Sequence, residues 1–308
     1  MAVEPNENAL KEQPSPCCNF PMASLAHFIA FSFAFKLALM AIWHNGTLNE
    51  TASIDASSAG LLLGWGVFTT IGVKNGRPLW LDQHLARLRR DAARCDIPIP
   101  FSDDVLRDGL TAVLSANQIN NGLARLTATR RDDGRWNINS ATDITLLALE
   151  SPSPKTNSLR VGFAPAPSQG ELMGVKTTSY LPYIWSWRQA QKCGWDEVIL
   201  LHNGLIVEAA RSSIFWAKEG ILQTSPLSLG ALDGIGRSLT FEWAKTNGIE
   251  IQTVEAPARA LNACEEVFLI SAATGPRAIG TLCVSNHEIS LPTTNPIFEG
   301  FRAWWDSQ

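Results

Sequence analysis

One lysine, one glutamate and one glycine turn stand out because their residue types fit a single kind of chemistry. Lys176 lies in the polar segment Lys176-Thr-Thr-Ser-Tyr180, Glu208 closes the apolar run Leu205-Ile-Val207, and Gly234-Ile-Gly-Arg237 opens a predicted helix. A lysine amine can form a Schiff base with an aldehyde, and a carboxylate can keep a ring nitrogen protonated. Free N–H groups at the start of a helix attract a phosphate. Together these residues predict a site for an aldehyde cofactor with a phosphate tail.

Each of these residues also has an ordinary structural interpretation. Most lysines are solvated surface charges, a glutamate at a strand end is often solvated, and most glycine-rich helix starts bind nothing. Arg87, on a predicted helix, could give its fork of donors to the same phosphate or could be an exposed helix arginine. The prediction therefore depends on the fold bringing these residues together.

Composition excludes several other classes of protein. The chain has 308 residues, 45% of them hydrophobic, which is enough to build a sizeable core in two domains of ordinary size. Its 25 basic and 29 acidic residues give a net charge of -4 without a basic cluster, so we expect no nucleic-acid partner. Its 6 cysteines show no C-x-x-C motif and no zinc-type Cys/His spacing. We therefore expect no metal site and a reducing, cytoplasmic setting.

The N-terminal stretch is the one segment that argues for a membrane. Met22–Ile42 is an apolar run of nearly the length of a membrane span, but His27 and Lys36 interrupt it. The charged residues before it are Glu4, Glu7 and Glu12 against only Lys11, whereas a signal peptide begins with basic residues. We therefore favour an extension outside the catalytic fold for residues 1–39, or a translation start at Met40, over a membrane anchor or signal.

The spacing of apolar residues predicts an α/β chain of the α+β type with two domains. Ser151–Asn157 is rich in proline and serine and predicts the linker. A small α+β domain is expected over residues 40–155, as a mostly antiparallel sheet with helices on one side, and a large cofactor-binding domain over 156–308. In the small domain we expect a hairpin at 42–55, strands at 60–73, 79–81, 123–129 and 144–149, and helices at 82–94 and from 102.

The large domain alternates strands and helices. A helix is expected to end at Asn247-Gly248, a good C-terminal stop. The expected strands are 159–164, 197–201, 205–208, 213–217, 221–224, 249–254, 266–270 and 278–284, and the expected helices are 184–192, 235–246 and 296–305.

Seven segments, taken in order, resemble the class IV pyridoxal-phosphate aminotransferase family over about residues 40–285. The segments are Gly64-Trp-Gly-Val-Phe-Thr-Thr70, Asp82-Gln-His-Leu-Ala-Arg-Leu88, Lys176-Thr-Thr-Ser-Tyr-Leu-Pro182, Asp196-Glu-Val-Ile-Leu-Leu201, Val207-Glu-Ala-Ala-Arg-Ser-Ser-Ile-Phe215, Leu232-Asp-Gly-Ile-Gly-Arg237 and Glu265-Glu-Val-Phe-Leu269. The resemblance implies fold type IV, in which two α/β domains with mixed sheets hold pyridoxal 5'-phosphate at their interface, and usually a homodimer.

The resemblance also implies roles for individual residues. Lys176 would be the Schiff-base lysine and general base, and Glu208 would face the pyridine nitrogen. Three residues would hold the phosphate: Arg87 with its side chain, and Ile235 and Gly236 with their amides. Two further residues fall where cofactor contacts are expected, or are simply a packed tyrosine and a strand-end serine: Tyr180 and Ser271.

Three activities compete within this family: branched-chain aminotransferase, D-amino acid aminotransferase and 4-amino-4-deoxychorismate lyase. The segment Phe68-Thr69-Thr70 favours the lyase, because transaminases usually show Phe-Glu-Thr or Phe-Glu-Gly there. The lyase releases pyruvate from a small-molecule substrate and forms 4-aminobenzoate for folate synthesis. Thr70 could place its hydroxyl near the leaving group, or could be a strand threonine that merely packs.

Four positions depart from the family pattern. Trp65 stands where Asp is common, Ser213 where Asn is common, Asp233 where Pro is common, and Gly236 where Thr or Ser is common. Loss of a hydroxyl at position 236 would remove one phosphate hydrogen bond, worth roughly 1–3 kcal/mol if nothing replaces it. These departures motivate a third hypothesis, a non-catalytic relative that no longer binds the cofactor.

Overall fold

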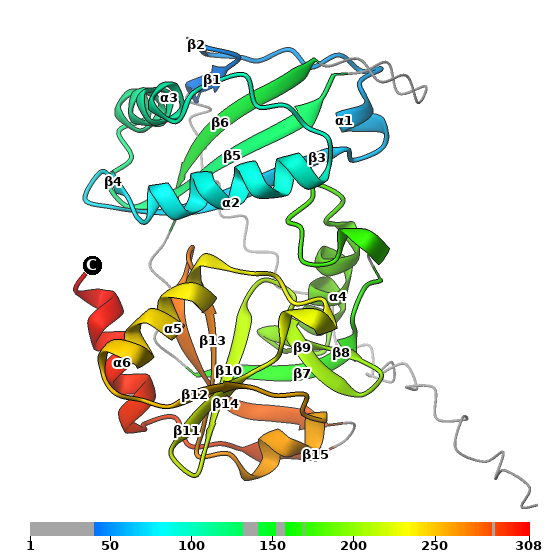
Figure 1. Cartoon of the computed structure of the whole chain (residues 1–308), viewed down its shortest axis with the longest axis vertical. Helices are drawn as coiled ribbons and strands as arrows, with labels where there is room; N and C mark the ends of the chain where they lie inside the picture. The colour runs from blue at the N-terminus through cyan, green and yellow to red at the C-terminus, as the bar shows by residue number, and fades with distance from the viewer. Residues whose placement is uncertain (1–39, 132–140, 152–157, 169, 285–286) are drawn as a thin grey trace, which may run out of the picture.

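The computed structural model describes residues 40–131, 141–151, 158–168, 170–284 and 287–308. Two sheets lie one above the other, the upper built from residues before 151 and the lower from residues after 158 (Figure 1). This arrangement confirms the predicted mixed α/β fold class. The extension 1–39 and most of the predicted linker lie outside the described residues, so the domain boundary stays a prediction. Across the described ranges, no helix is long and apolar enough to cross a membrane.

The upper sheet is antiparallel throughout. Its six strands follow the order β2-β1-β6-β5-β3-β4. Asn45 and Gly46, with φ values of 49° and 94°, form the predicted turn between the first two strands. The strands are β1 (Ile42–His44), β2 (Thr47–Asn49), β3 (Gly66–Lys74), β4 (Arg77–Pro78), β5 (Gly122–Arg130) and β6 (Thr142–Glu150).

Two helices cover one face of the upper sheet, as predicted. Ser102 caps the second by accepting a hydrogen bond from the backbone N–H of Val105. The helices are α2 (Leu81–Arg94) and α3 (Asp103–Ala116), and their leucines share one buried core with β3, β5 and β6. This packing fixes α2 across β3, which decides where the polar side chains of α2 can reach.

Two predictions for the upper half are wrong. The strand expected at 60–73 begins only at Gly66, because Ser58 caps a short helix, α1 (Ala59–Leu62), by accepting from the backbone N–H of Leu61. The strand expected at 79–81 is absent. β4 ends at Pro78, and Trp80 adopts a left-handed φ of 50° as the N-cap of α2. In both places local capping and turn geometry override the apolar pattern.

The lower sheet has nine strands and mixed pairing. Eight follow the order β12-β11-β10-β13-β14-β7-β8-β9, and β15 pairs with β14; β7 is parallel to β8 and to β14, and β11 is parallel to β12. The strands are β7 (Leu159–Pro165), β8 (Glu197–His202), β9 (Leu205–Ala209), β10 (Ser213–Lys218), β11 (Ile221–Thr224), β12 (Ile251–Thr253), β13 (Glu266–Ser271), β14 (Gly275–Val284) and β15 (His287–Ser290). The strand β15 was not predicted.

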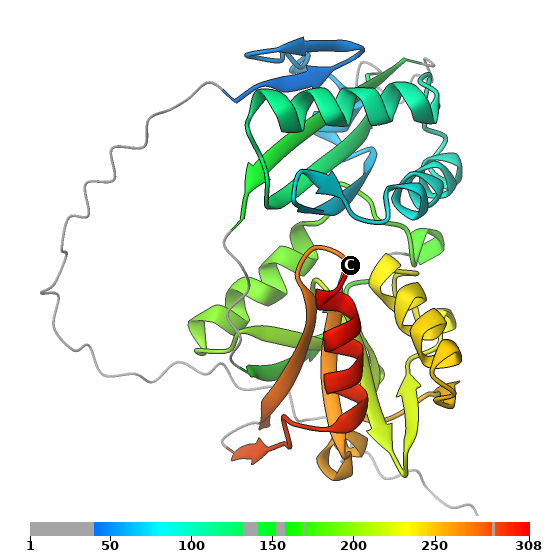
Figure 2. The same ribbon diagram turned by 90° about the vertical axis from the view of Figure 1, so that its left-hand side faces the viewer.

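The lower sheet curls around one core and carries helices outside it. Buried residues of β7, β8, β9, β10, β13 and β14 share the inner cluster. Outside, α5 (Ile235–Thr246) and α6 (Pro296–Asp306) pack on a second, aromatic cluster, and α4 (Leu181–Lys192) packs on β7 and β8. Figure 2 shows α5 and α6 side by side on one side of this sheet. The helix α4 begins at Leu181, three residues before the predicted start.

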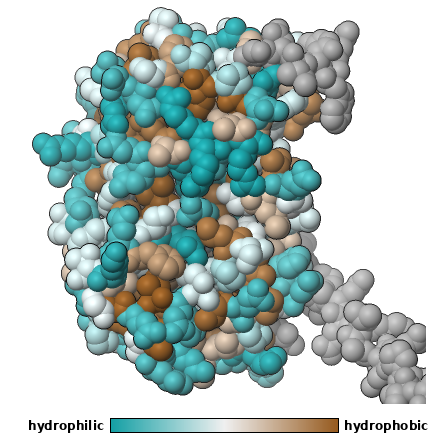
Figure 3. All heavy atoms as spheres, viewed as in Figure 1, coloured by the Kyte–Doolittle hydropathy of each residue, from teal (hydrophilic) through white to brown (hydrophobic). Residues whose placement is uncertain are grey.

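The outer surface carries polar and apolar residues side by side. Figure 3 shows hydrophilic and hydrophobic residues mixed over one face, without a single apolar area extending across both halves. The residues nominated from the sequence instead line a cavity between the two sheets.

Candidate active site

One cavity of about 400 Å³ lies between the upper and lower sheets. This volume is in the range of sites that hold small molecules. All eight residues that the sequence nominates line it: Thr70, Arg87, Lys176, Tyr180, Glu208, Ile235, Gly236 and Ser271. Tertiary structure thus brings together residues that are up to about two hundred positions apart in the chain.

The segment around Lys176 is attached to β3 of the upper sheet. The backbone N–H of Phe68 donates to the carbonyl of Lys176 at 3.0 Å, and the N–H of Thr178 donates to Gly66 at 2.8 Å. The N–H of Lys176 itself donates to the buried carboxylate of Asp91 at 3.2 Å. The lysine backbone is therefore held on both sides, and its side chain reaches into the cavity.

The Lys176 amine has an unusual environment. It lies over the rings of Phe68 and Tyr180, at 4.7 Å from each ring centre, and donates to the Tyr180 hydroxyl at 3.4 Å. Burial, and next the positive charge of Arg87, lowers the pKa of this amine to about 7. A large fraction of the amine is therefore neutral at neutral pH, as a nucleophile or a base requires.

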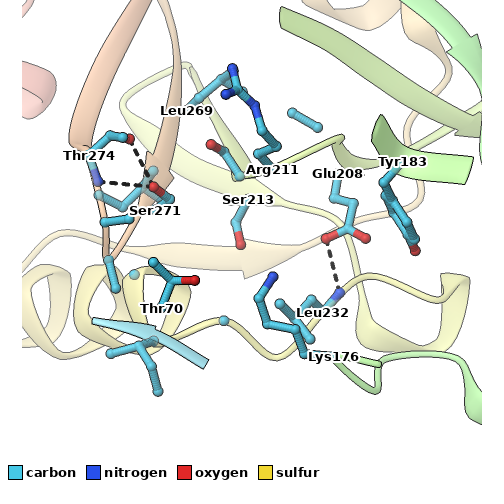
Figure 4. A pocket seen from close by; sticks show the side chains of 18 of the residues that line it. Thr70, Lys176, Tyr183, Glu208, Arg211, Ser213, Leu232, Leu269, Ser271 and Thr274 are labelled. Carbon is cyan, nitrogen blue, oxygen red and sulfur yellow. Dashed lines mark hydrogen bonds between the residues drawn. The ribbon is translucent and has the colours of Figure 1, made fainter. Parts of the chain in front are cut away.

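Glu208 ends an apolar strand with its carboxylate inside the cavity. Only 7% of the residue is exposed, and its Oε2 accepts from the backbone N–H of Leu232 at 3.1 Å. The Tyr183 hydroxyl also bonds this carboxylate, and burial raises the pKa of Glu208 to about 7. Figure 4 shows the Glu208 carboxylate and the Lys176 amine pointing into the same pocket.

Arg87 reaches the cavity from α2 through a chain of hydrogen bonds. Its Nη2 donates to the Thr69 hydroxyl at 2.8 Å, and the same oxygen lies 2.6 Å from Nδ1 of His84. Burial, and next Arg87, lowers the pKa of His84 to about 3, so the imidazole is neutral. Because arginine only donates, the Thr69 oxygen accepts from Arg87 and its proton is free for Nδ1 of His84.

The start of α5 forms a second edge of the cavity. Gly234 is the N-cap and has no side chain. No N-cap side chain therefore accepts a hydrogen bond from the first N–H groups of the helix. A Cβ at Gly236 would lie 2.7 Å from Cγ1 of Ile270. Packing of α5 against β13 therefore requires glycine at this position, which explains its departure from the hydroxyl residue common in the family.

Thr70 and Ser271 lie on other strands around the pocket. Thr70 is half-buried on β3, and Figure 4 shows its hydroxyl on the side of the pocket where Lys176 lies. Ser271 ends β13, where its hydroxyl bonds the Thr274 hydroxyl at 2.8 Å and accepts from the Thr274 N–H at 3.2 Å.

The other departures have local structural roles. The indole N–H of Trp65 donates to the carbonyl of Cys95 at 2.7 Å, which ties the residue before β3 to the residue after α2. Asp233 accepts from Arg90 of α2 at 2.9 Å, so it links the two halves beside the cavity. Ser213 lines the cavity, where a Cβ on Gly234 would lie 3.3 Å from its hydroxyl oxygen.

Several lining residues were not nominated from the sequence. Tyr183, Arg125, Arg211 and Arg277 line the cavity together with His84. Arg211 and His84 lie inside motifs that carry the family resemblance, so these motifs could have nominated both residues for the site. Arg125 and Arg277 lie in strands with no distinguishing pattern, and nothing in their local sequence marks them.

Comparison with known proteins gives one family. A family model described as amino-transferase class IV matches residues 66–281. The chain is 27% identical to a D-alanine aminotransferase from Bacillus licheniformis, over 75% of this chain and 84% of that protein. It is also 27% identical to an aminodeoxychorismate lyase from Bacillus subtilis (strain 168), over 74% and 82% of the two chains.

Solved structures show the same fold. The branched-chain amino acid aminotransferase from Escherichia coli superposes with a TM-score of 0.78 at 22% identity, over 87% of this chain and 93% of that one. A further branched-chain amino acid aminotransferase with the same TM-score and identity was determined with pyridoxamine 5'-phosphate. At this level of identity the comparison establishes the fold, while the reaction depends on the residues of this chain.

Proposed function

This chain belongs to the class IV aminotransferase family, its cofactor is pyridoxal 5'-phosphate, and we propose that it is a 4-amino-4-deoxychorismate lyase. In this reaction the substrate loses its enolpyruvyl group as pyruvate and becomes 4-aminobenzoate, a precursor of folate. The family and the cofactor are common to the lyase and the aminotransferases. The choice between them depends on the residues beside Lys176.

The residues around the cavity fit the cofactor. Lys176 offers a buried amine for the aldehyde, and Glu208 offers a fixed carboxylate for the ring nitrogen. Arg87 and the uncapped first turn of α5, at Ile235 and Gly236, offer donors for the phosphate. The Nε of Arg87 is buried and has no hydrogen-bond partner within the described part of the chain. A donor left open in this way is typical of a site built to receive an anion.

The reaction divides between the cofactor and three side chains. Pyridoxal phosphate, when bound, supplies an aldehyde that joins the substrate amine and a ring that accepts the electrons released at the neighbouring carbon. Lys176 takes the proton from the carbon that carries the amine, which its lowered pKa allows. Glu208 keeps the proton on the ring nitrogen.

Thr70 completes the elimination. The bond between the ring carbon and the enolpyruvyl oxygen breaks, and Thr70 donates a proton to that oxygen. Lys176 then returns a proton to Thr70, so the proton lost from carbon ends on the departing enol, which becomes pyruvate. The new double bond makes the ring of 4-aminobenzoate aromatic.

One observation carries the proposal. Thr70 lines the cavity on the side where Lys176 lies, whereas the neighbouring Thr69 is buried against Arg87 and His84. A hydroxyl on the same side of the cavity as the lysine suits a reaction that must protonate a leaving oxygen. The same convergence of lysine, glutamate and phosphate-binding groups on one cavity supports the catalytic interpretation over a non-catalytic relative.

An aminotransferase acting on branched-chain or D-amino acids is the second candidate. The D-alanine aminotransferase of Bacillus licheniformis is as similar to this chain as the lyase of Bacillus subtilis, at 27% identity in both cases. An aminotransferase would need a second substrate, an oxoacid, to complete its cycle, whereas the lyase would not.

The experiment follows from this difference. Purified protein loaded with pyridoxal phosphate is given aminodeoxychorismate without any oxoacid, and both 4-aminobenzoate and pyruvate are measured. We expect equal amounts of the two products over many turnovers, and none from Lys176→Ala. Glutamate formation from 2-oxoglutarate and an amino acid, without release of pyruvate from aminodeoxychorismate, would select the aminotransferase instead.

We also propose a homodimer in the cytoplasm. Large apolar side chains are exposed on the single chain, among them Leu181 at 71% and Trp185 at 61%. Such side chains are typical of surfaces that a second copy covers. Light scattering of the purified protein would measure the mass directly. The thiols of Cys95, Cys264 and Cys283 are free, which suits a reducing compartment.

A further inference from the structure

Two arginines on one side of the cavity take no part in the chemistry above. Arg211 follows β9 and Arg277 lies on β14, and both line the same cavity as Lys176. Figure 4 shows Arg211 extending to the side of the pocket opposite Lys176 and Thr70. Glu197, at the start of β8, lines this side as well.

Glu197 accepts its hydrogen bonds from groups other than Arg277. Its Oε2 accepts from Nε of Arg211 at 3.0 Å, and its Oε1 accepts from the backbone N–H of Val198 at 3.2 Å. The guanidinium of Arg211 also lies 4.4 Å from the ring centre of Trp187, which holds its plane in place. One carboxylate is therefore already bound to one of the two arginines.

Arg277 has no such partner. Within the described part of the chain its side-chain Nε is buried and has no hydrogen-bond acceptor. The carboxylates of Asp196 and Glu197 act on Arg277 electrostatically, but neither accepts a hydrogen bond from its buried Nε. A buried donor without an acceptor is unfavourable, and a charged acceptor that enters the cavity relieves it.

We propose that Arg277, supported by Arg211, forms a subsite for a carboxylate of the substrate that is remote from the amine reacting at Lys176. This inference rests on the proposed function, whose substrate carries two carboxylates, one on the ring and one on the enolpyruvyl group. A guanidinium donates two parallel hydrogen bonds to a carboxylate, so the subsite would select acidic over neutral substrates and fix their orientation.

The test compares an acid with its neutral isostere. Calorimetry of the loaded enzyme measures the Kd of 4-aminobenzoate and of 4-aminobenzamide for wild type, Arg277→Met and Arg277→Lys. Wild type is expected to bind the acid roughly tenfold or more tightly than the amide. Arg277→Met should bring this ratio to about 1, and Arg277→Lys should keep part of it. Equal ratios in wild type and Arg277→Met overturn the subsite.

Arg259→Met is the matched control, because Arg259 is exposed and does not line the cavity. It removes the same charge from the protein and should keep the wild-type ratio. An equal loss in Arg259→Met would mean that net charge, not a subsite, causes the preference. The visible absorbance of the bound cofactor and the melting temperature show whether each variant is loaded and folded.

A second pair of ligands separates this inference from the reaction itself. If the wild type transaminates and releases no pyruvate from aminodeoxychorismate, the proposed function fails. The subsite is then tested with 2-oxoglutarate against 2-oxopentanoate, which lacks the remote carboxylate. A preference for 2-oxoglutarate that Arg277→Met abolishes supports the subsite, and a preference that survives overturns it.

Discussion

Arg87, which lines the cavity, donates a hydrogen bond of 2.8 Å to the hydroxyl of Thr69. The two threonines of the Phe68-Thr69-Thr70 segment therefore do different work. The hydroxyl of Thr69 bonds Arg87 and His84 of α2, whereas Thr70 lines the cavity itself. Adjacent residues on a strand point to opposite faces, so one segment contacts the arginine that we propose for the phosphate and also lines the proposed reacting centre.

The first prediction concerns this bond. Thr69→Val keeps the shape of the side chain but removes the oxygen that accepts from Arg87. We expect the Kd of pyridoxal phosphate to rise about tenfold, because a hydrogen bond to a charged group is lost and the guanidinium is less well held. Equilibrium dialysis of the apoenzyme measures this Kd.

Pyridoxal without its phosphate provides the internal control for this variant. Its affinity should not change in Thr69→Val, because Arg87 has no phosphate to bind. Thr111→Val, on the exposed side of α3, should match the wild type with both ligands. Equal losses with pyridoxal and pyridoxal phosphate would show general disruption of the site.

The second prediction concerns the pH dependence of cofactor binding. The neutral amine of Lys176 is the form that reacts with an aldehyde, and burial lowers its pKa to about 7. The rate at which apoenzyme and pyridoxal phosphate develop visible absorbance should therefore rise with pH through a midpoint near 7. An unperturbed lysine would give a midpoint above about 10.

The same pH series with N-acetyl-lysine corrects for titration of the cofactor itself. Arg87→Met should move the enzyme midpoint upward, since the charge of Arg87 is the second cause of the lowered pKa. A corrected midpoint unchanged from that of N-acetyl-lysine would show that the amine is solvated.

The third prediction concerns stability and Glu208. Burial raises the pKa of this carboxyl from 4.5 to about 7, so between these values the folded state keeps a proton that the unfolded state has lost. The free energy of unfolding should therefore fall as pH rises through this window. Relative to Glu208→Gln, which cannot titrate, we expect the apoenzyme to lose roughly 3 kcal/mol.

Urea denaturation of both proteins across this pH window measures the difference. Glu255→Gln, at an exposed position, should keep the wild-type dependence on pH. A constant difference between wild type and Glu208→Gln at every pH would contradict the raised pKa.

The fourth prediction concerns Thr70. If its hydroxyl protonates the leaving oxygen, Thr70→Val should lower kcat of the lyase reaction about a hundredfold, whereas Thr70→Ser should retain most of it. Because Thr70 acts on the transition state, KM should change little. Stopped-flow measurement of 4-aminobenzoate formation gives both constants.

An unchanged visible spectrum of Thr70→Val would show that the cofactor site is intact. If Thr70→Val and Thr70→Ser were equally slow, the hydroxyl would not be the source of the effect. A fully active Thr70→Val would remove Thr70 from the mechanism.

The sequence determined the type and order of the reacting groups. Few kinds of binding site combine a lysine, a glutamate, an arginine and a glycine turn, and the motifs that hold them follow one another in the order of a known family. All the nominated residues line one cavity. Apolar periodicity also located the helices α2, α3, α5 and α6 to within a few residues, because amphipathic spacing reflects burial on one face. The individual roles of the nominated residues stay predictions until the variants above are measured.

Only the tertiary structure decided which residues of other elements each site residue contacts. Alternation along β3 separates Thr69 from Thr70, but the helix that packs across the strand decides which of the two meets Arg87. Gly236 became understandable only when Ile270, from a distant strand, was seen to leave no room for a side chain. Arg277 has no local signal, because its proposed role depends on Arg211 and Glu197, which belong to other segments of the chain. Periodicity records burial along a single element, whereas a site is made where several elements meet.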